Sequence, residues 1–174
     1  MAEPFAVAIS GSPRAPSKSK TLAEQALVEL GALGCATQLI DVAELPAEAM
    51  VARGGEYPEI SDAIEVLGRA TIVIATSPTY RALYTGVLKC FFDLMPQDHL
   101  SGKACIGLQT GITPQHALSP EYGLRPLFAS LGGLPVGAVY ATDAEFTEGH
   151  PGDELMERVR AVCWAAVAGV TPSL

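Results

Sequence analysis

The chain has few residues that bind metals or exchange disulfides. Its four cysteines are far apart in the sequence and form no Cys-x-x-Cys pair: Cys35, Cys90, Cys105 and Cys163. Neither a zinc site nor a redox dithiol is therefore encoded locally, and we expect buried free thiols. The three histidines also lack the spacing of metal ligands: His99, His116 and His150. We expect no metal in the site.

The sequence also lacks a long apolar run, an internal repeat and an excess of positive charge. No apolar run is long enough to cross a bilayer, so we expect no membrane partner. Glu3 and Pro4 stand where a signal peptide would carry positive charge, and no small-residue cleavage site follows, which predicts a cytoplasmic protein. The formal net charge of −8 argues against a nucleic-acid partner, which would require a basic face.

What the sequence does contain is a regular alternation of strand-like and helix-like segments. Four β-prone runs show no strict polar alternation, as expected of strands covered on both faces: residues 5–10, 70–76, 104–110 and 136–142. Residues 38–42 offer a fifth, shorter strand, and helical patterns lie between and after the strands: residues 21–33, 60–69, 85–95, 121–131 and 153–168. We predict one domain of residues 1–174, a flavodoxin-like doubly wound five-stranded parallel sheet in the order 2-1-3-4-5.

The most informative segment is the loop of residues 10–21, Ser-Gly-Ser-Pro-Arg-Ala-Pro-Ser-Lys-Ser-Lys-Thr, which joins the first strand to the first helix. It contains five hydroxyl groups and three of the eleven basic residues. The start of a helix adds unpaired N–H groups and the positive end of the dipole. Pro16 and Pro13 replace glycines that the P-loop and dinucleotide patterns require, so we predict a site for a single terminal phosphate. The alternative is a solvated surface loop in which Thr21 and Glu24 form a capping box.

Two further loops follow the third and fourth strands, so all three loops should meet at the carboxyl edge of the sheet. Residues 77–84 combine the rigid Pro78 with Tyr80 and Tyr84, which suits the face or edge of a planar heterocycle. Alternatively, both tyrosines pack against neighbouring helices. In the loop of residues 110–114, Gly111 is less specific, because a glycine after a strand usually serves the turn.

Residues 85–95 form a helical pattern that is apolar almost all the way round. Only Lys89 and Asp93 make a polar stripe, four residues apart. Since one small domain cannot readily cover such a helix, it is either buried beneath another loop or used in a subunit interface. We favour the interface and therefore predict a homodimer or homotetramer.

Several motifs together resemble the NAD(P)H-dependent FMN reductase family. They are Gly-Ser-x-Arg-x-x-Ser-x-Ser from Gly11, Ser-Pro-Thr-Tyr at residues 77–80 and Gly-x-Leu-Lys from Gly86. Further segments resemble the flavin reductases of two-component sulfonate monooxygenase systems: residues 77–95, Leu-Ser-Gly-Lys at 100–103, Thr110-Gly111 with His116, and Tyr-Gly-Leu-Arg-Pro at 122–126. The resemblance covers the whole chain.

The resemblance implies roles for particular residues. The first loop would hold the FMN phosphate through Ser12, Arg14, Ser17 and Ser19, with Lys20 and Thr21 beside them. The isoalloxazine ring would lie along Pro78, Thr79 and Tyr80, with Thr110 and Gly111 approaching from the next loop. Arg81 and residues 114–116 lie near the expected approach of NADPH or NADH. The helix with Lys89 would build a dimer, and two dimers would form a tetramer.

Tyr122 matches a tyrosine that, in the sulfonate-system reductases, lies in a π-helical insertion at the tetramer interface close to the flavin. It is the candidate for tuning flavin exchange, and the alternative is an interfacial aromatic without a kinetic role. Two positions depart from the pattern: many family members have asparagine at Ser19, and the sulfonate-system pattern has glycine at Ile112. The branched Ile112 side chain would narrow the room for nicotinamide or a second flavin.

The resemblance implies hydride transfer from reduced nicotinamide to FMN, followed by release of reduced FMN to a partner monooxygenase. No acid–base triad is required, because the cofactors carry the chemistry. One alternative is an enzyme that keeps FMN bound and reduces a quinone, an azo compound or a metal ion. Another is a flavodoxin-type electron carrier that does not turn over NAD(P)H.

Overall fold

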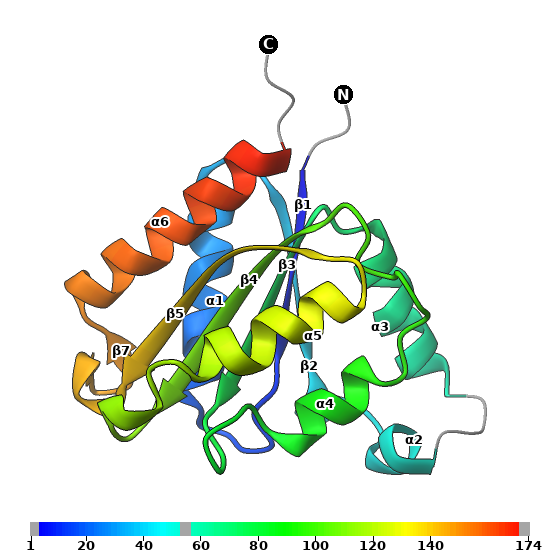
Figure 1. Cartoon of the computed structure of the whole chain (residues 1–174), viewed down its shortest axis with the longest axis horizontal. Helices are drawn as coiled ribbons and strands as arrows, with labels where there is room; N and C mark the ends of the chain where they lie inside the picture. The colour runs from blue at the N-terminus through cyan, green and yellow to red at the C-terminus, as the bar shows by residue number, and fades with distance from the viewer. Residues whose placement is uncertain (1–3, 53–56, 171–174) are drawn as a thin grey trace.

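The computed structural model describes residues 4–52 and 57–170, and its central feature is a sheet of five parallel strands (Figure 1). The strands are β1 (Phe5–Ser10), β2 (Ala36–Asp41), β3 (Ile72–Pro78), β4 (Ala104–Gly111) and β5 (Leu134–Thr142). Their order in the sheet is β2-β1-β3-β4-β5, so the predicted flavodoxin-like topology is confirmed. The predicted single domain also includes residues 1–3, 53–56 and 171–174, which lie outside the described residues. Glu3, which was used in predicting that there is no signal peptide, is one of them.

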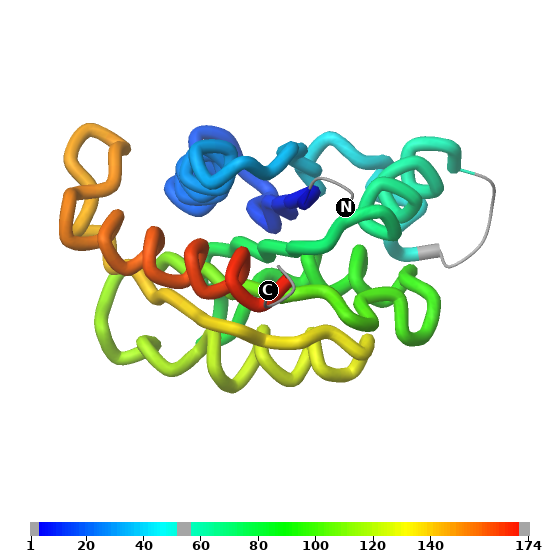
Figure 2. The backbone as a smooth tube through the Cα atoms, turned by 90° about the horizontal axis from the view of Figure 1, so that it is seen from above, coloured from blue at the N-terminus to red at the C-terminus, as the bar shows by residue number. Residues whose placement is uncertain are grey.

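Helices cover both faces of this sheet. On one face lie α1 (Lys18–Ala32) and α6 (Asp153–Val170), and on the other lie α3 (Pro58–Arg69), α4 (Gly86–Phe92) and α5 (Arg125–Ser130). Figure 2 shows α1 and α5 on opposite sides of the strands. Both faces need covering because successive residues of a strand point to opposite faces. In β1, Ala6 and Ala8 lie in one core, and Val7 and Ile9 lie in the other. Across residues 4–52 and 57–170, no helix is both long enough and apolar enough to cross a membrane.

Several short elements were not predicted from the sequence. They are α2 (Ala47–Ala52), the hairpin strands β6 (Phe146–Thr147) and β7 (His150–Pro151), and the 3₁₀ turns η1 (Val42–Glu44), η2 (Pro114–His116) and η4 (Asp143–Glu145). The predicted helix of residues 121–131 is divided into the π-helix η3 (Pro120–Leu124) and α5. Pro126 lies in the first turn of α5, where a missing N–H leaves no hydrogen bond unmade.

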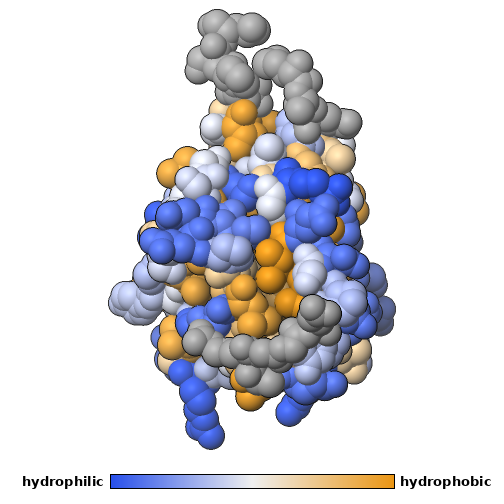
Figure 3. Space-filling model, turned by 90° about the vertical axis from the view of Figure 1, so that its right-hand side faces the viewer, coloured by the Kyte–Doolittle hydropathy of each residue, from blue (hydrophilic) through white to orange (hydrophobic). Residues whose placement is uncertain are grey.

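Helix α4 is shorter than predicted and is covered within the chain itself. Its side chains of Leu88, Phe91 and Phe92 are buried, and the Phe92 ring lies 6.1 Å from that of Phe128 in α5. Helices α2 and α5 cover this side of the helix, whereas Val87, Cys90 and Leu94 are only partly buried. The outer side carries the Lys89–Asp93 ion pair at 2.5 Å. Figure 3 views the molecule from the side on which α2 and α3 lie, which is the right-hand side of Figure 1. On this face, apolar atoms gather between hydrophilic ones.

The carboxyl ends of β1 and β3 are tied to the start of α4. The Gly11 amide donates to the Thr76 carbonyl oxygen at 2.7 Å, and the Thr85 hydroxyl donates to the Gly11 carbonyl oxygen at 2.5 Å. The same hydroxyl caps α4 by accepting from the Leu88 amide at 3.2 Å. A Cβ at residue 11 would lie 2.8 Å from both Leu88 Cβ and Thr76 O, so only glycine permits this approach. The loop after β1 is therefore anchored to β3 and α4.

We expect Thr85→Val to lower the free energy of unfolding by about 1–3 kcal/mol, because it leaves the buried Gly11 carbonyl and Leu88 amide without partners. Urea denaturation measures the change. Thr37→Val, on an exposed position of β2, is the matched control and should change stability by less than about 0.5 kcal/mol. Equal effects of the two substitutions would show that the Thr85 tie contributes nothing.

Candidate functional site

A cavity of about 350 Å³ lies at the carboxyl edge of the sheet. The loop after β1 supplies most of its lining, and the loops after β3, β4 and β5 supply the rest: Ser12, Arg14, Pro16, Ser17, Lys18, Pro78, Tyr80, Thr110 and Asp143. The predicted convergence of three loops is thus observed. The loop after β5 was not predicted to take part.

At one end of the cavity, the loop after β1 presents hydroxyl groups beside the start of α1. Ser17 is the N-cap of α1, and its Oγ accepts from the Lys20 amide at 3.4 Å and lies 2.9 Å from Ser19 Oγ. Ser12 is buried, and its Oγ accepts from the Arg14 amide at 3.3 Å. The alternative capping box of Thr21 with Glu24 is wrong, because α1 begins three residues before Thr21.

Three of the residues assigned to this loop do not line the cavity: Ser19, Lys20 and Thr21. Ser19 is buried behind Ser17. The Lys20 ammonium lies 2.6 Å from Asp41 Oδ2 and 4.0 Å from Glu44 Oε1, on the side of α1 that faces β2. The hydrogen bond to Asp41 raises the pKa of Lys20. The Thr21 hydroxyl donates back to the Ser17 carbonyl oxygen at 3.3 Å. Lys20 and Thr21 fix the first turn of α1 from outside the cavity.

Lys18 and Asp143 are cavity residues that the sequence analysis did not assign. Lys18 Nζ lies 3.1 Å from Asp143 Oδ1 and 5.5 Å from the centroid of the Phe146 ring. Asp143 is the first residue after β5, and the rule that sites lie at the carboxyl ends of strands was the signal that would have found it.

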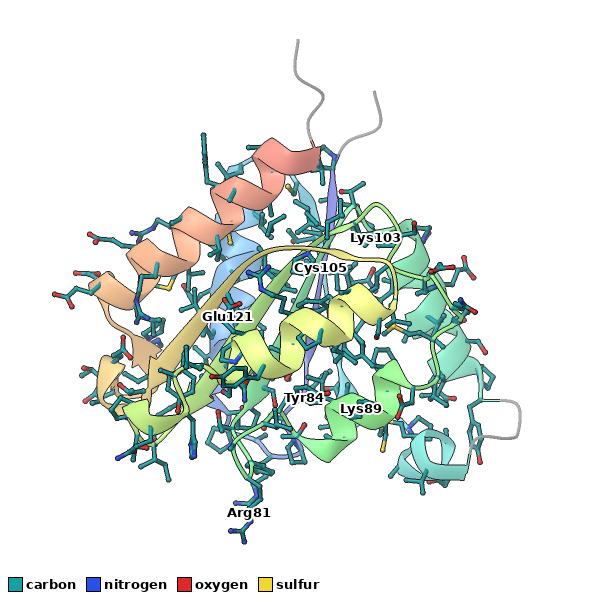
Figure 4. All side chains as sticks on the ribbon, viewed as in Figure 1. Arg81, Tyr84, Lys89, Lys103, Cys105 and Glu121 are labelled. Carbon is teal, nitrogen blue, oxygen red and sulfur yellow. The ribbon has the colours of Figure 1, made fainter. Side chains whose placement is uncertain are left out.

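The other end of the cavity is formed by Pro78, Tyr80 and Thr110. Tyr80 starts a tight turn in which its amide donates to the Leu83 carbonyl at 2.8 Å and the Leu83 amide donates back at 3.2 Å. The two central residues of this turn, Arg81 and Ala82, have φ values of 52° and 68°. That conformation favours glycine or asparagine, so this turn is strained. Figure 4 shows Arg81 projecting away from the sheet, and its side chain does not line the cavity.

Beneath this end, hydrogen bonds join the loops after β3 and β4. The Thr79 amide donates to the Thr110 carbonyl at 2.7 Å, and the buried Gln109 amide nitrogen donates to the Thr79 hydroxyl at 3.1 Å. The Tyr140 hydroxyl donates to the Thr113 carbonyl at 2.8 Å, and burial raises the pKa of Tyr140. A Cβ on Gly111 would overlap the Tyr140 hydroxyl, so Gly111 serves close packing here. Thr79 and Gly111 support the cavity without lining it.

The two other tyrosines have different environments. Tyr84 is half-buried and packs against Gly123 of η3, and burial raises the pKa of Tyr84 (Figure 4). The packing alternative therefore holds for Tyr84, whereas Tyr80 lines the cavity. Tyr122 lies in the π-helix η3, as the resemblance implies, and 69% of its surface is exposed. The side chain of Ile112 is also exposed.

The donors and shape of the cavity suit a phosphorylated planar ligand. At one end, Ser12, Arg14 and Ser17 line the cavity beside the start of α1, which suits a phosphate. Pro78 and Tyr80 offer a flat apolar border at the other, and the volume lies in the range of about 300–1,000 Å³ that is usual for ligand sites. Two other hollows, between β2 and α3 and beside the β6–β7 hairpin, include several carboxylates and no basic residue in their linings.

Among the described residues, the cavity lining contains no Ser–His or Cys–His pair and no metal-binding set. No cysteine or histidine lines it, and the described part of the chain holds no group of three or more metal-binding side chains. Burial raises the pKa of the Cys105 and Cys163 thiols to about 12, so neither forms a thiolate at neutral pH.

Comparisons with known proteins agree with this geometry. The family model of NADPH-dependent FMN reductase matches residues 6–148. An FMN reductase (NADPH) of Escherichia coli is 31% identical over 145 residues, which are 83% of this chain and 76% of that protein. The NADH-dependent FMN reductase SfnF of Pseudomonas fluorescens is 35% identical over 147 residues, which are 82% of this chain and 78% of that protein. The apo structure of an NADH:FMN oxidoreductase (EMOB) is 31% identical, with a TM-score of 0.90 over 97% of this chain and 91% of that one. The chain belongs to the NADPH-dependent FMN reductase family.

Proposed function

We propose that the chain is an NAD(P)H-dependent FMN reductase that uses FMN as an exchangeable substrate and supplies reduced FMN to a partner monooxygenase. The observation that carries this proposal is the cavity at the carboxyl edge, with phosphate donors at one end and Pro78, Tyr80 and Thr110 at the other. The family membership identifies FMN as the phosphorylated ligand. The relatives' names include both NADPH-dependent and NADH-dependent enzymes, so we propose reduced nicotinamide as the donor class.

In this proposal the loop after β1 binds the FMN phosphate through side chains that converge on the start of α1: Ser12, Arg14, Ser17 and Ser19. Pro78 and Tyr80 border the isoalloxazine ring, and Thr110 approaches it from the next strand. Thr79 and Gly111 hold that end in shape, while Lys20 and Thr21 fix the first turn of α1.

The protein's contribution to the reaction is orientation. When bound, FMN supplies N5 as acceptor of the hydride that C4 of reduced nicotinamide carries. The loops after β1, β3 and β4 would hold the flavin at the edge of the sheet and orient it towards reduced nicotinamide. We assign Arg81, which projects outward from the Tyr80–Leu83 turn, to contact with the anionic part of the nicotinamide cofactor.

The rim of the cavity favours exchange of FMN over permanent retention. Tyr80 is 41% exposed and Ile112 is 81% exposed, so neither side chain closes over the site. Tyr122 is exposed on the π-helix that packs against Tyr84, and we assign it to the control of flavin release.

We further propose that the chain works in the cytoplasm as a homodimer or homotetramer. None of its four cysteines is in a disulfide, which fits a reducing compartment. The interface we propose lies at the exposed apolar side chains of Leu83, Leu118 and Tyr122, around the π-helix. The buried side chains of α4 are not part of this surface.

We expect Arg14→Ala to weaken FMN binding about tenfold or more while changing the rate of hydride transfer much less, because the guanidinium contacts the phosphate and not the reacting ring. Quenching of flavin fluorescence gives the dissociation constant, and stopped-flow absorbance gives the transfer rate. Arg69→Ala, at an exposed position that ends α3, removes the same charge and should leave both values unchanged. Unchanged FMN affinity in Arg14→Ala would remove Arg14 from the site.

The reaction itself is tested by a single-turnover experiment without oxygen. The protein loaded with FMN is mixed with NADH or NADPH, and the flavin absorbance is followed. We expect at least one of the two to bleach the flavin far faster than the same mixture without protein, because the cavity holds the reactants together. FMN binding with no bleaching by either nicotinamide would contradict the reductase and favour an electron carrier.

A further inference from the structure

The cavity that we assign to the FMN phosphate contains a carboxylate. Asp143 lines it together with Lys18, and Lys18 Nζ lies 3.1 Å from Asp143 Oδ1. Lys18 also lies 3.5 Å from the Asp143 carbonyl oxygen, towards which it donates, and 5.5 Å from the centroid of the Phe146 ring. One of the two cations in the cavity lining is therefore already neutralised by the protein itself, and Arg14 is the other.

Asp143 is held at the cavity by a rigid frame. It opens the turn η4 directly after β5. Within that turn the Glu145 carboxylate accepts from the Thr142 amide at 2.7 Å and from the Thr142 hydroxyl at 2.9 Å. Glu145 also pairs with Arg158 of α6, whose guanidinium donates to the Tyr140 carbonyl at 2.9 Å. The position of the Asp143 backbone is thus fixed against both β5 and α6.

A carboxylate at this place opposes the ligand that the cavity binds. A phosphate monoester carries about −1.5 to −2 charges at pH 7, so the Asp143 carboxylate repels it. The same carboxylate competes with the phosphate for the Lys18 ammonium. Both effects lower the affinity for the phosphate without changing the contacts to the flavin ring.

We propose that Asp143 sets the affinity for FMN by holding Lys18 in an ion pair, so that FMN is exchanged and not retained. Asp143 is not a catalytic residue, because it does not touch the reacting atoms. It is a specificity-determining residue, because it affects phosphorylated and unphosphorylated flavins differently. The proposal rests on the proposed function, since it assumes that the phosphate of FMN occupies the cavity beside Lys18. It predicts that the pair weakens binding of a phosphorylated flavin and leaves binding of an unphosphorylated one unchanged.

The test compares FMN with riboflavin in fluorescence-quenching titrations of the wild-type protein and of Asp143→Asn. We expect Asp143→Asn to bind FMN about fivefold more tightly and to release it correspondingly more slowly, because the repulsion is lost and Lys18 is freed. Riboflavin affinity should not change. Asp143→Glu keeps the charge and should keep the wild-type FMN affinity. Glu29→Gln breaks the Glu29–Arg160 pair, at 3.1 Å between α1 and α6, and is the control of equal charge change.

Lys18→Ala tests the neutralisation directly. In the wild-type background it should weaken FMN binding only slightly, whereas in Asp143→Asn it should abolish the gain in affinity. Thermal melting followed by circular dichroism checks that each variant is folded. If Asp143→Asn left FMN affinity unchanged, or tightened FMN and riboflavin equally, the proposed role of Asp143 would be overturned. Wild-type protein that bound neither flavin would instead overturn the proposed function.

Discussion

The site depends on a small set of hydrogen bonds that tie the loop after β1 to β3 and to the start of α4. Gly11 donates to Thr76, Thr85 donates to Gly11, and the same threonine caps α4. Glycine at residue 11 lets the backbone approach Thr76 and Leu88 closely, because a Cβ would not fit there. These contacts fix the direction in which the loop leaves the sheet. That direction sets where Ser12, Arg14 and the first turn of α1 meet the loops after β3 and β4.

The loop after β1 carries basic residues, although the protein as a whole is acidic, with a net charge of −8. Arg14 and Lys18 line the cavity, whereas the Lys20 ammonium pairs with Asp41 outside it. Lys18 is in turn paired with Asp143. The cavity is therefore only moderately cationic, which fits a ligand that must arrive and leave repeatedly. A site built to retain the same phosphate would leave both cations free.

The sheet order and the loops of the site were predictable because they follow from local patterns: buried β-prone runs, helical periodicity and polar loops at the ends of strands. The directions of individual side chains were not. Lys18 and Lys20 are two residues apart and so lie about 200° apart around α1, which prevents both from facing the cavity. This angle can be used only when the start of α1 is known. The sequence predicted a start at Thr21, whereas the helix begins at Lys18. The Lys18–Asp143 pair joins residues 125 positions apart, and the burial of Phe91 and Phe92 depends on α5. Such contacts are fixed by tertiary packing.

The central claim is that FMN is a substrate that exchanges at the carboxyl edge of the sheet. The most direct measurement is the initial rate of NADPH and NADH oxidation by flavin-free protein as FMN is raised from below one equivalent to a large excess. The account predicts a saturable rate that keeps rising well beyond one FMN per chain. A rate that stops rising at one equivalent, or FMN binding without nicotinamide oxidation, would contradict it.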